Sequence, residues 1–405
     1  MISAITGSGG ANASASPFIA ELPQLTANGV TLNLPPEVSY SASDQSTSYA
    51  AMGRGSSASM IAQIAGRNYQ DLRELAALST LQSLMMDENR AMWSARTTGL
   101  GAPTCTVAAQ TPNTGFSALT GVTTNVYVKV TQVTMFGESA GSSAQSAAPS
   151  GSQDVLVTIT AVTTNGNAEA FNVYASTGTS DPGDGFRYYQ GTTGYNKFEL
   201  GGALKTTGAT VPTADSTNDS NAFKGLFLQL EGGTNFYNKA LNATLALSDI
   251  DNACVDRYQT VKAMVQELWA DVRTRQRIKD QILNNGTNAN GYRIEVGQDG
   301  IIAGLTVSAI LNPASGQEMP VNTEPWFKAG GVVGLSKTLP FANSNVPNVW
   351  EMKLPQDYLA IDWPVIDMNY RNSVIAYGAL IGYAPDFNFW IRGVQNAYGA
   401  GTANQ

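Results

Sequence analysis

The feature that most limits how this chain can fold is a helical pattern of about 30 residues, at positions 66–95. Apolar side chains recur there at intervals of three, four or seven, which builds one apolar stripe along a helix. Residues 97–103, Thr-Thr-Gly-Leu-Gly-Ala-Pro, then supply helix-stop signals. A helix of this length would be roughly 45 Å long, which makes it a beam rather than a typical globular helix. The stripe consists of Leu72, Leu75, Leu78, Leu81, Met85 and Met92.

Between residues 104 and 205 the composition changes to one that favours short strands. Apolar and polar residues alternate within 126–130, 155–159 and 170–174, and Gly, Ser and Asn punctuate these runs. About 100 residues of short strands predict an all-β sandwich of the immunoglobulin-like type. The Cys…Trp…Cys signature is absent, so only the general architecture is predicted.

The segments that flank this sandwich have the composition of exposed, flexible linkers. Residues 99–103 precede it, and the polar stretch 213–220 follows it. We therefore expect an independently folded knob inserted into a host domain. Its role stays open between a passive projection and a surface that binds neighbours, decoration proteins or host glycans.

The N-terminal region has low charge and little helical periodicity. Residues 1–27 predict an extended arm that becomes ordered on a partner surface. Residues 28–62 combine alternating apolar residues, Pro35-Pro36 and a Ser-rich stretch, which predicts a long two-stranded loop without a core of its own. A disordered loop is the alternative.

The C-terminal half predicts helix first and then strands. Residues 222–283 show helical patterns, with an N-cap at Ser248-Asp249 and apolar residues from Val261 to Val272 near one helical face. Residues 292–395 are strand-rich, and 374–382 predicts a buried strand or a short helix. A basic cluster between these regions is either a solvated helix end or a contact for an acidic neighbour. It consists of Arg273, Arg275, Arg277 and Lys279.

The chain contains no histidine, which removes the commonest general base and transition-metal ligand. Residues 137–141, Gly-Glu-Ser-Ala-Gly, fit the nucleophile elbow of α/β-hydrolases, but that serine needs a histidine to take its proton. The glycines at 330–334 with Lys337 break the spacing of a phosphate-binding loop. Asp181-Pro-Gly-Asp-Gly is turn chemistry rather than a calcium loop. We therefore predict no catalytic, cofactor-binding or metal-binding residues.

Charge and cysteine content narrow the possible partners. The formal net charge of −8 argues against general binding to nucleic acid or to acidic membranes. No apolar run reaches the roughly 18 residues that span a bilayer. The two cysteines, Cys105 and Cys254, are too few for a disulfide scaffold, and we predict free thiols in a reducing cytoplasm.

The order of several segments carries a family resemblance. The pattern 72–93 ends in the acidic-basic run Asp87-Glu88-Asn89-Arg90, and characteristic runs follow in order along the C-terminal half. These runs are 323–326 with Gly330 and Leu335, 346–350, 358–364, 378–385 and 389–391. Together they resemble the major capsid proteins of tailed bacteriophages, the Hong Kong 97-type fold, over nearly the whole chain except 104–205.

The resemblance implies an α+β fold with five parts. They are an N-terminal arm (1–27), an extended loop (28–62), a peripheral domain with a long spine helix (63–103), the inserted immunoglobulin-like domain (104–205), and an axial domain with return strands of the peripheral domain (206–405). The inserted domain would lie as a knob on the outer surface.

The resemblance also implies a function and partners. The subunit would assemble into hexamers and pentamers of an icosahedral shell around packaged double-stranded DNA, in the bacterial host cytoplasm, and end in the virion. DNA would be contacted only non-specifically, and no membrane is involved. Portal, decoration and separate scaffolding proteins are the expected partners, since the chain reaches the loop within about 30 residues of Met1. A phage tail-tube or other structural virion protein is the alternative.

Overall fold

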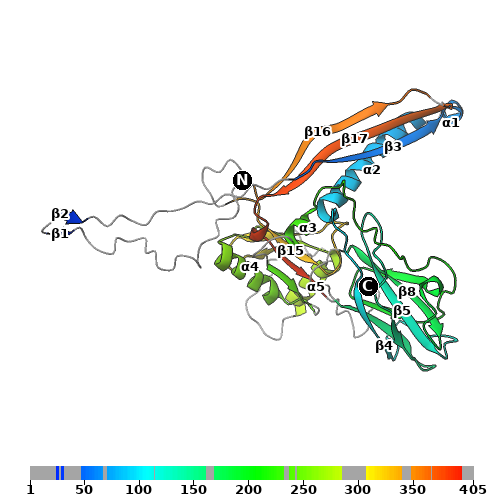
Figure 1. Cartoon of the computed structure of the whole chain (residues 1–405). Coiled ribbons are helices and arrows are strands. Elements are labelled where there is room, and N and C mark those ends of the chain that lie inside the picture. The colour runs from blue at the N-terminus through cyan, green and yellow to red at the C-terminus, as the bar shows by residue number, and fades with distance from the viewer. Residues whose placement is uncertain are drawn as a thin grey trace, which may run out of the picture.

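The structure is a computed structural model that describes residues 24–26, 29–31, 47–66, 71–113, 115–160, 168–231, 237–241, 244–284, 307–339, 348–365 and 367–394. It is a mixed α+β protein with three bodies, which we call the wing, the sandwich and the central domain (Figure 1). The wing projects away from the central domain, and the sandwich lies beside the C-terminal end of the wing's long helix.

The wing is one sheet backed by one helix. Strands β16 (Trp350–Asp362), β17 (Asn369–Gly382) and β3 (Ala50–Ser59) form an antiparallel sheet in that order. Helix α1 (Met60–Gly66) follows β3 at the tip, and helix α2 (Leu72–Ser94) runs back along the sheet (Figure 1). Since side chains alternate between the faces of a strand, Val374 and Ala376 of β17 face α2 and pack on Leu84.

Helix α2 confirms the predicted spine helix over most of its length. Asp71 caps it, because its carboxylate accepts hydrogen bonds from the backbone N–H groups of Arg73 and Glu74 at 3.0 and 3.3 Å. The helix has 23 residues and a length of roughly 34 Å, shorter than the predicted beam. The expected N-terminal extension to position 66 is wrong, because residue 66 ends the separate helix α1.

Residues 104–200 form two antiparallel sheets around a common core. One sheet has the order β10 (Lys197–Leu200), β7 (Asp154–Thr160), β4 (Thr104–Gln110), and the other has β6 (Gln145–Ala147), β5 (Asn125–Val133), β8 (Ala170–Gly178), β9 (Tyr188–Thr193). A short 3-10 helix, η1 (Asp184–Phe186), lies between β8 and β9. Inward-facing residues such as Val128, Val157 and Val173 are fully buried between the sheets. The predicted sandwich is confirmed as an architecture.

The immunoglobulin strand order is not confirmed. In a constant-type immunoglobulin domain, the first, second, fourth and fifth strands share one sheet. Here the first, fourth and seventh strands of the sandwich share one sheet, and the second, third, fifth and sixth share the other. The alternation of apolar residues predicts two covered faces, but it holds no information about which strand crosses to which sheet.

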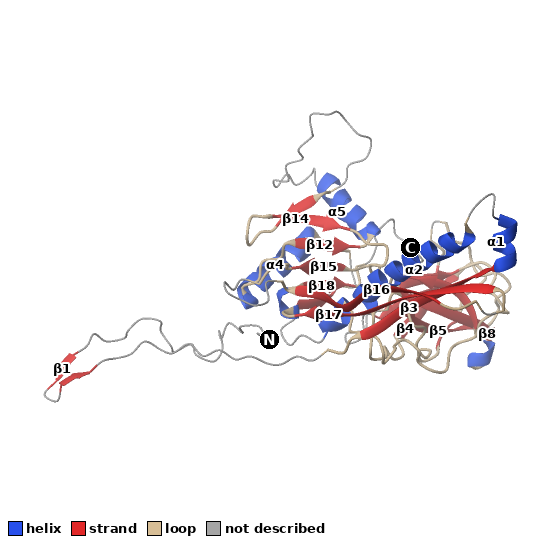
Figure 2. Ribbon diagram, turned by 90° about the horizontal axis from the view of Figure 1, so that it is seen from above, coloured by secondary structure: helices blue, strands red, loops and turns tan. Residues whose placement is uncertain are grey.

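The central domain is built on a six-stranded sheet in the order β11-β18-β15-β12-β14-β13. The strands are β11 (Tyr237–Ala240), β18 (Phe389–Arg392), β15 (Val332–Leu335), β12 (Glu267–Ala270), β14 (Glu318–Asn322) and β13 (Ala309–Leu311). Figure 2 shows this ladder between its helices. Helices α4 (Leu247–Val261) and α5 (Val272–Asn284) cover one face, and α3 (Leu226–Glu231) with the end of α2 covers the other.

Strand β12 corrects the helical prediction for this region. Leu268 and Trp269 were expected on a helical face, but they lie in a strand between β14 and β15. Helix α4 ends at Lys262, which adopts the left-handed conformation with φ of 58°. Of the two predictions for 374–382, the strand is confirmed within β17, although it is only partly buried, and Phe389–Arg392 forms the last strand, β18, as predicted.

The N-terminal segments also differ from their predicted boundaries. Strands β1 (Gln24–Thr26) and β2 (Gly29–Thr31) form a small hairpin far from the rest of the molecule (Figures 1 and 2). The predicted border between arm and loop, at 27 and 28, falls between these two paired strands. The predicted extended loop 28–62 is wrong for Ala50–Ser59, because β3 pairs with β17 along its whole length. Most other residues of the arm and loop lie outside the described residues.

Candidate functional site

Four consecutive residues near the end of α2 join the helix to every neighbouring part of the protein. Successive residues of an α-helix point about 100° apart, so a run of four reaches all sides. Asp87, Glu88, Asn89 and Arg90 do so here. We call these residues the hub. The sequence singled out this acidic-basic run, but it did not show its partners.

The first two hub residues fasten the helix to the wing's sheet. The carboxylate of Asp87 pairs with the guanidinium of Arg54 on β3. The carboxylate of Glu88, which is buried, accepts a hydrogen bond from the hydroxyl of Tyr358 on β16. Burial, together with this carboxylate, raises the pKa of Tyr358 to about 12, so the phenol keeps its proton and remains a donor.

The other two hub residues reach the central domain and the sandwich. The side-chain amide of Asn89 donates to Oε1 of Glu324, just after β14, at 2.6 Å. Arg90 pairs with both carboxylate oxygens of Glu169, which precedes β8 of the sandwich. The Arg90 guanidinium also lies 5.2 Å from the ring centre of Trp326, in cation–π range. Two consecutive residues therefore bridge the wing to both other bodies.

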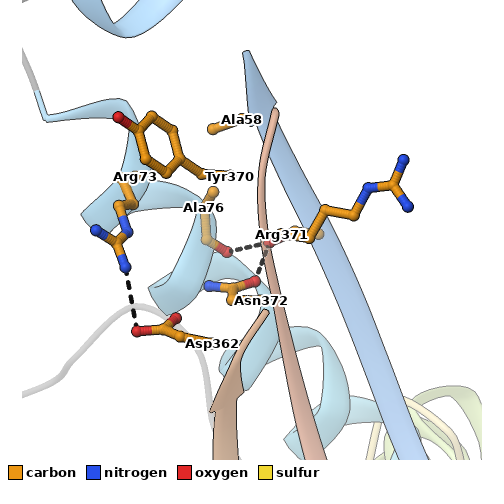
Figure 3. Close-up of a pocket in the computed structure, with 8 residues that line it drawn as sticks. Ala58, Arg73, Ala76, Asp362, Tyr370, Arg371 and Asn372 are labelled. Atoms are coloured by element: carbon orange, nitrogen blue, oxygen red, sulfur yellow. Dashed lines mark hydrogen bonds and ion pairs between the residues drawn. The ribbon is translucent and has the colours of Figure 1, made fainter. Parts of the chain in front are cut away.

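A shallow pocket lies where the other end of α2 meets the sheet (Figure 3). It has a volume of about 190 Å³ including the solvent at its mouth, and several of the polar groups that line it are paired within the subunit. Arg73 bonds to Asp362 at 3.1 Å and stacks over Tyr370, while the Ser56 hydroxyl donates to the backbone oxygen of Ala76 at 3.2 Å. These contacts fasten helix to sheet, as the hub does at the other end.

An aromatic cluster anchors the C-terminal end of α2 in the central domain. The ring of Trp93 lies 5.2 Å from the rings of Trp269 and Phe327 and 5.8 Å from that of Phe227. Trp390 of β18 continues the cluster at 4.9 Å from Phe227. Aromatic contacts of this kind each contribute about 0.5–1.5 kcal/mol beyond the burial of their surface.

Half of the predicted apolar stripe of α2 faces solvent, while Leu81 and Met92 pack against buried clusters. Leu78 is 51% exposed and Leu75 and Met85 are similarly open, whereas the buried helix face carries Thr80, Leu84 and Glu88. These three residues of the stripe are therefore about half open to solvent in the folded subunit. The exposed apolar residues on this side of the wing are Ile61, Ile64, Leu75, Leu78, Met85 and Met86.

The opposite side of the wing is also apolar. Leu359, Ile375 and Tyr377 point away from α2, because they alternate with residues that face it. Trp363 is 51% exposed, and its ring N–H donates to Ser373 Oγ at 3.0 Å. Leu359 and Tyr377 are exposed as well. The wing is thus one helix and one sheet thick, with apolar side chains open on both faces.

The residues that the sequence associated with chemistry have structural roles. The hydroxyl of Ser139 is buried and accepts a hydrogen bond from the Gln132 backbone N–H at 2.9 Å, so it is no exposed nucleophile. Asp181 and Asp184 are occupied by the guanidinium of Arg187, and Asp184 also pairs with Lys129. These cations already occupy the carboxylates that a calcium ion would need.

The structure also locates the glycine-rich segment, the basic cluster and the two cysteines that the sequence singled out. Gly334 lies within β15, and Lys337 pairs with Glu267, so neither belongs to a phosphate-binding loop. The basic cluster lies along α5, where Arg275 donates to the backbone oxygen of Val307. Cys105 and Cys254 are buried free thiols, as predicted.

Among the described residues, no three His, Cys, Asp or Glu side chains come together in an arrangement that could hold a metal ion. No helix in this part of the chain is long and apolar enough to cross a membrane.

Comparison with known proteins gives similarity in structure alone. No protein-family model matches the chain, and no curated protein matches its sequence. Solved structures with partial similarity include a virus-like particle from Pyrococcus furiosus, at 8% identity over 41% of this chain and 59% of that one, with a TM-score of 0.26.

Two further structures are similar to the same degree. An encapsulin complex from Synechococcus elongatus matches at 11% identity over 43% of this chain and 57% of that one, with a TM-score of 0.26. A structure named Mycobacterium phage Patience matches at 13% identity over 42% and 50%, also at 0.26. The matched part of this chain thus spans between half and three fifths of the length of these proteins.

Proposed function

We propose that this chain is the major capsid protein of a tailed bacteriophage, with the Hong Kong 97-type fold. Copies would assemble into hexamers and pentamers and then into an icosahedral shell around double-stranded DNA. In this proposal the wing is the peripheral domain, α2 is the spine helix, and the central domain is the axial domain. The β1–β2 hairpin is the tip of the extended loop.

The observation that carries the proposal is the apolar surface on both faces of the wing. A soluble monomer rarely exposes a contiguous apolar patch of more than a few hundred Å². Burying one leucine-sized side chain contributes about 1.5–3 kcal/mol. Leu75, Leu78 and Met85 on one face, and Leu359 and Trp363 on the other, therefore favour association. A wing that exposes apolar side chains on both faces can contact a neighbouring subunit on each side, as a subunit of a shell does.

Contacts of the hub within the subunit also support a role in a shell. A thin wing can transmit load across a shell only if it is held rigidly to its body. The pairs Asn89–Glu324 and Arg90–Glu169, with the cluster around Trp93, hold it at its base. Portal, scaffolding and decoration proteins, the virion location and non-specific contact with DNA follow from the proposed function and are part of the same proposal.

Electron microscopy of the expressed chain tests the proposal directly. Closed icosahedral particles are expected, alone or with a co-expressed scaffolding protein, and tubes would instead favour the tail-tube alternative. The double substitution Leu75→Ser and Leu78→Ser should leave a folded, soluble subunit and prevent shells. Phe186→Ser is the matched control, because Phe186 is 64% exposed on the sandwich, away from the wing. Shells from the double variant that match wild type would contradict the proposed role of the wing.

A further inference from the structure

We infer that the inserted sandwich is a brace that fixes the angle between the wing and the central domain. It is clamped to α2 at one point and to the base of α5 at another. The inference concerns the subunit itself, and only its consequence for particle size rests on the proposed function.

The first clamp joins the sandwich to the spine helix through Glu169. Its carboxylate accepts two hydrogen bonds from Arg90 Nε, at 3.0 and 3.1 Å, and one from the Ser94 hydroxyl at 2.6 Å. The Glu169 side chain is only 18% exposed, so its charge depends on these donors. The Glu169 backbone N–H bonds to the Val133 carbonyl at 2.8 Å, which fixes the clamp to β5.

The second clamp joins the sandwich to the central domain through the β9–β10 turn. The hydroxyl of Tyr195 donates to Asp271 Oδ2 at 3.0 Å. Asp271 also caps α5, since it accepts from the Thr274 backbone N–H at 3.3 Å. It holds the loop before β15 as well, through the Gly330 N–H at 3.2 Å. The buried carboxylate of Asp271 thus joins the sandwich to α5 and to the loop before β15.

Close backbone approach shows that this turn is fitted to the central domain. A Cβ atom at Gly194 would lie 2.6 Å from the Cβ of Ala329, a distance that real side chains essentially never show. The contact therefore depends on a glycine at this position, beside the tyrosine that makes the bond. A freely tethered knob has no such requirement.

The chain connections add further ties near the first clamp. Residues 213–220 were expected to be a flexible linker, but Thr217 is fully buried. Its hydroxyl accepts from the Leu100 N–H at 2.8 Å, and its carbonyl accepts from the Thr134 hydroxyl at 2.8 Å. Asp215 accepts from the Gly101 N–H at 3.1 Å. Most of the segment is exposed, as predicted, but Asp215 and Thr217 fix it to the opposite connection and to the sandwich.

The geometry has a mechanical consequence. The covalent connections and Glu169 hold the sandwich at the end of α2, while Tyr195 holds it at α5. A rigid two-sheet body between these points limits rotation of the wing about the aromatic cluster at Trp93. Opening either clamp should then loosen the other, although Glu169 and Tyr195 share no hydrogen-bond partner among the described residues.

Hydrogen exchange on the full-length chain tests this coupling. Glu169→Gln removes the charge at the first clamp, and Tyr195→Phe removes only the hydroxyl at the second. Each should raise exchange at its own clamp by roughly tenfold, as expected for loss of a bond to a charged group. For a brace, Glu169→Gln also raises exchange at the amides of Thr274 and Gly330. Tyr195→Phe likewise raises exchange at the Ala95 amide, which closes the last turn of α2.

The controls separate a brace from a local contact. Asp181→Asn removes a carboxylate that pairs with Arg187 inside the sandwich, and it should leave both clamp regions unchanged. Ser94→Ala removes one bond to Glu169 and provides a milder variant if Glu169→Gln does not fold. The inference would be overturned if each variant raised exchange rates only at its own clamp and if these effects were additive in the double variant.

Particle size provides a second measurement, and this measurement requires that the chain forms shells, as proposed above. If the chain forms shells, Glu169→Gln with Tyr195→Phe should broaden the distribution of diameters in electron micrographs, while Asp181→Asn should not. Wild-type chain without any shells would contradict the proposed function and leave the exchange test of the brace intact. Shells of unchanged, uniform size from the double variant would count against the brace.

Discussion

A buried pair of carboxyl groups in the sandwich should make its stability depend on pH. Asp154 is fully buried on the outer face of the three-stranded sheet, and neither of its carboxylate oxygens receives a hydrogen bond among the described residues. Glu199, on the adjacent strand β10, is 2% exposed and accepts from the backbone and side-chain amides of Asn113 at 2.9 and 2.8 Å. Glu199 thus has donors of its own, whereas Asp154 can bond to it only when one carboxyl is protonated.

Burial first, and then the hydrogen bond and charge of Glu199, raise the pKa of Asp154 from 3.8 to about 7. Between these values the folded sandwich binds more protons than the unfolded chain. Its free energy of unfolding therefore falls as pH rises from 3.8 to about 7 and is level above that. The full difference amounts to about 4 kcal/mol, and somewhat over a third of it lies between pH 5.5 and 7.

The substitution Asp154→Asn keeps the shape and removes the titration, so it isolates this contribution. Hydrogen exchange at β7 and β10 is compared between wild type and variant at the same pH, which cancels the intrinsic rates. We expect the ratio of their exchange rates to change about 15-fold between pH 5.5 and 7, because Asp154 is only half deprotonated at pH 7. The chain has no histidine to obscure this window, and pH 5.5 lies above the sequence pI of about 4.7.

Asp181→Asn is again the matched control. Bonds from the Gly183 N–H and from Arg187 lower the pKa of Asp181, so this carboxyl does not titrate between pH 5.5 and 7. Its exchange ratio to wild type should stay constant across the window. A constant ratio for Asp154→Asn as well would refute the proton held between Asp154 and Glu199.

Three further outcomes follow from the same physical arguments. Burial, with the charge of Arg392, lowers the pKa of Lys328 from 10.5 to about 7, so between these pH values the folded protein binds fewer protons than the unfolded chain. Urea unfolding followed by tryptophan fluorescence should therefore show a free energy of unfolding that rises with pH above 7. Lys328→Met should abolish that rise. Leu84→Ala should cost about 2–5 kcal/mol of subunit stability because Leu84 is fully packed. Leu78→Ala on the same helix should change that stability by less than about 0.5 kcal/mol. Equal costs of the two substitutions in urea unfolding would contradict the assigned helix faces. Particles boiled in SDS should run as a monomer of 42.7 kDa, because the first lysine is Lys129 and the region 28–62 offers no amine for an isopeptide bond; a ladder of covalent oligomers would refute this.

Local patterns predicted the elements whose partners lie close in sequence or whose period is unambiguous. Helix α2, strands β5, β7 and β8, and the last strand β18 were all predicted from spacing and turn residues. Strand β12 was missed, because four residues between two helices carry too little alternation to separate a strand from a helix. Its place between β14 and β15 is set by tertiary packing, which overrides the local signal.

The hub shows the same limit for the candidate site. The run at 87–90 was recognised as unusual, but its partners are Arg54, Tyr358, Glu324 and Glu169. All four come from separate elements, more than 30 and up to 270 positions away. Nothing in the spacing of charges along one helix can indicate such pairings. The predicted linker 213–220 shows this limit too, because polar residues form flexible loops only when their bonding groups have no fixed partners.

The exposed stripe on α2 shows what helical periodicity measures. Apolar residues at spacings of three and four mean that one helix face is removed from water, but not by which chain. Leu84 packs on β17 of its own subunit, whereas Leu75, Leu78 and Met85 remain about half exposed. Core and interface obey the same transfer free energy, so a sequence cannot separate them until the structure shows which face is already covered. A stripe left open after folding is therefore evidence for assembly, and in this wing the sheet on the other side is left open as well.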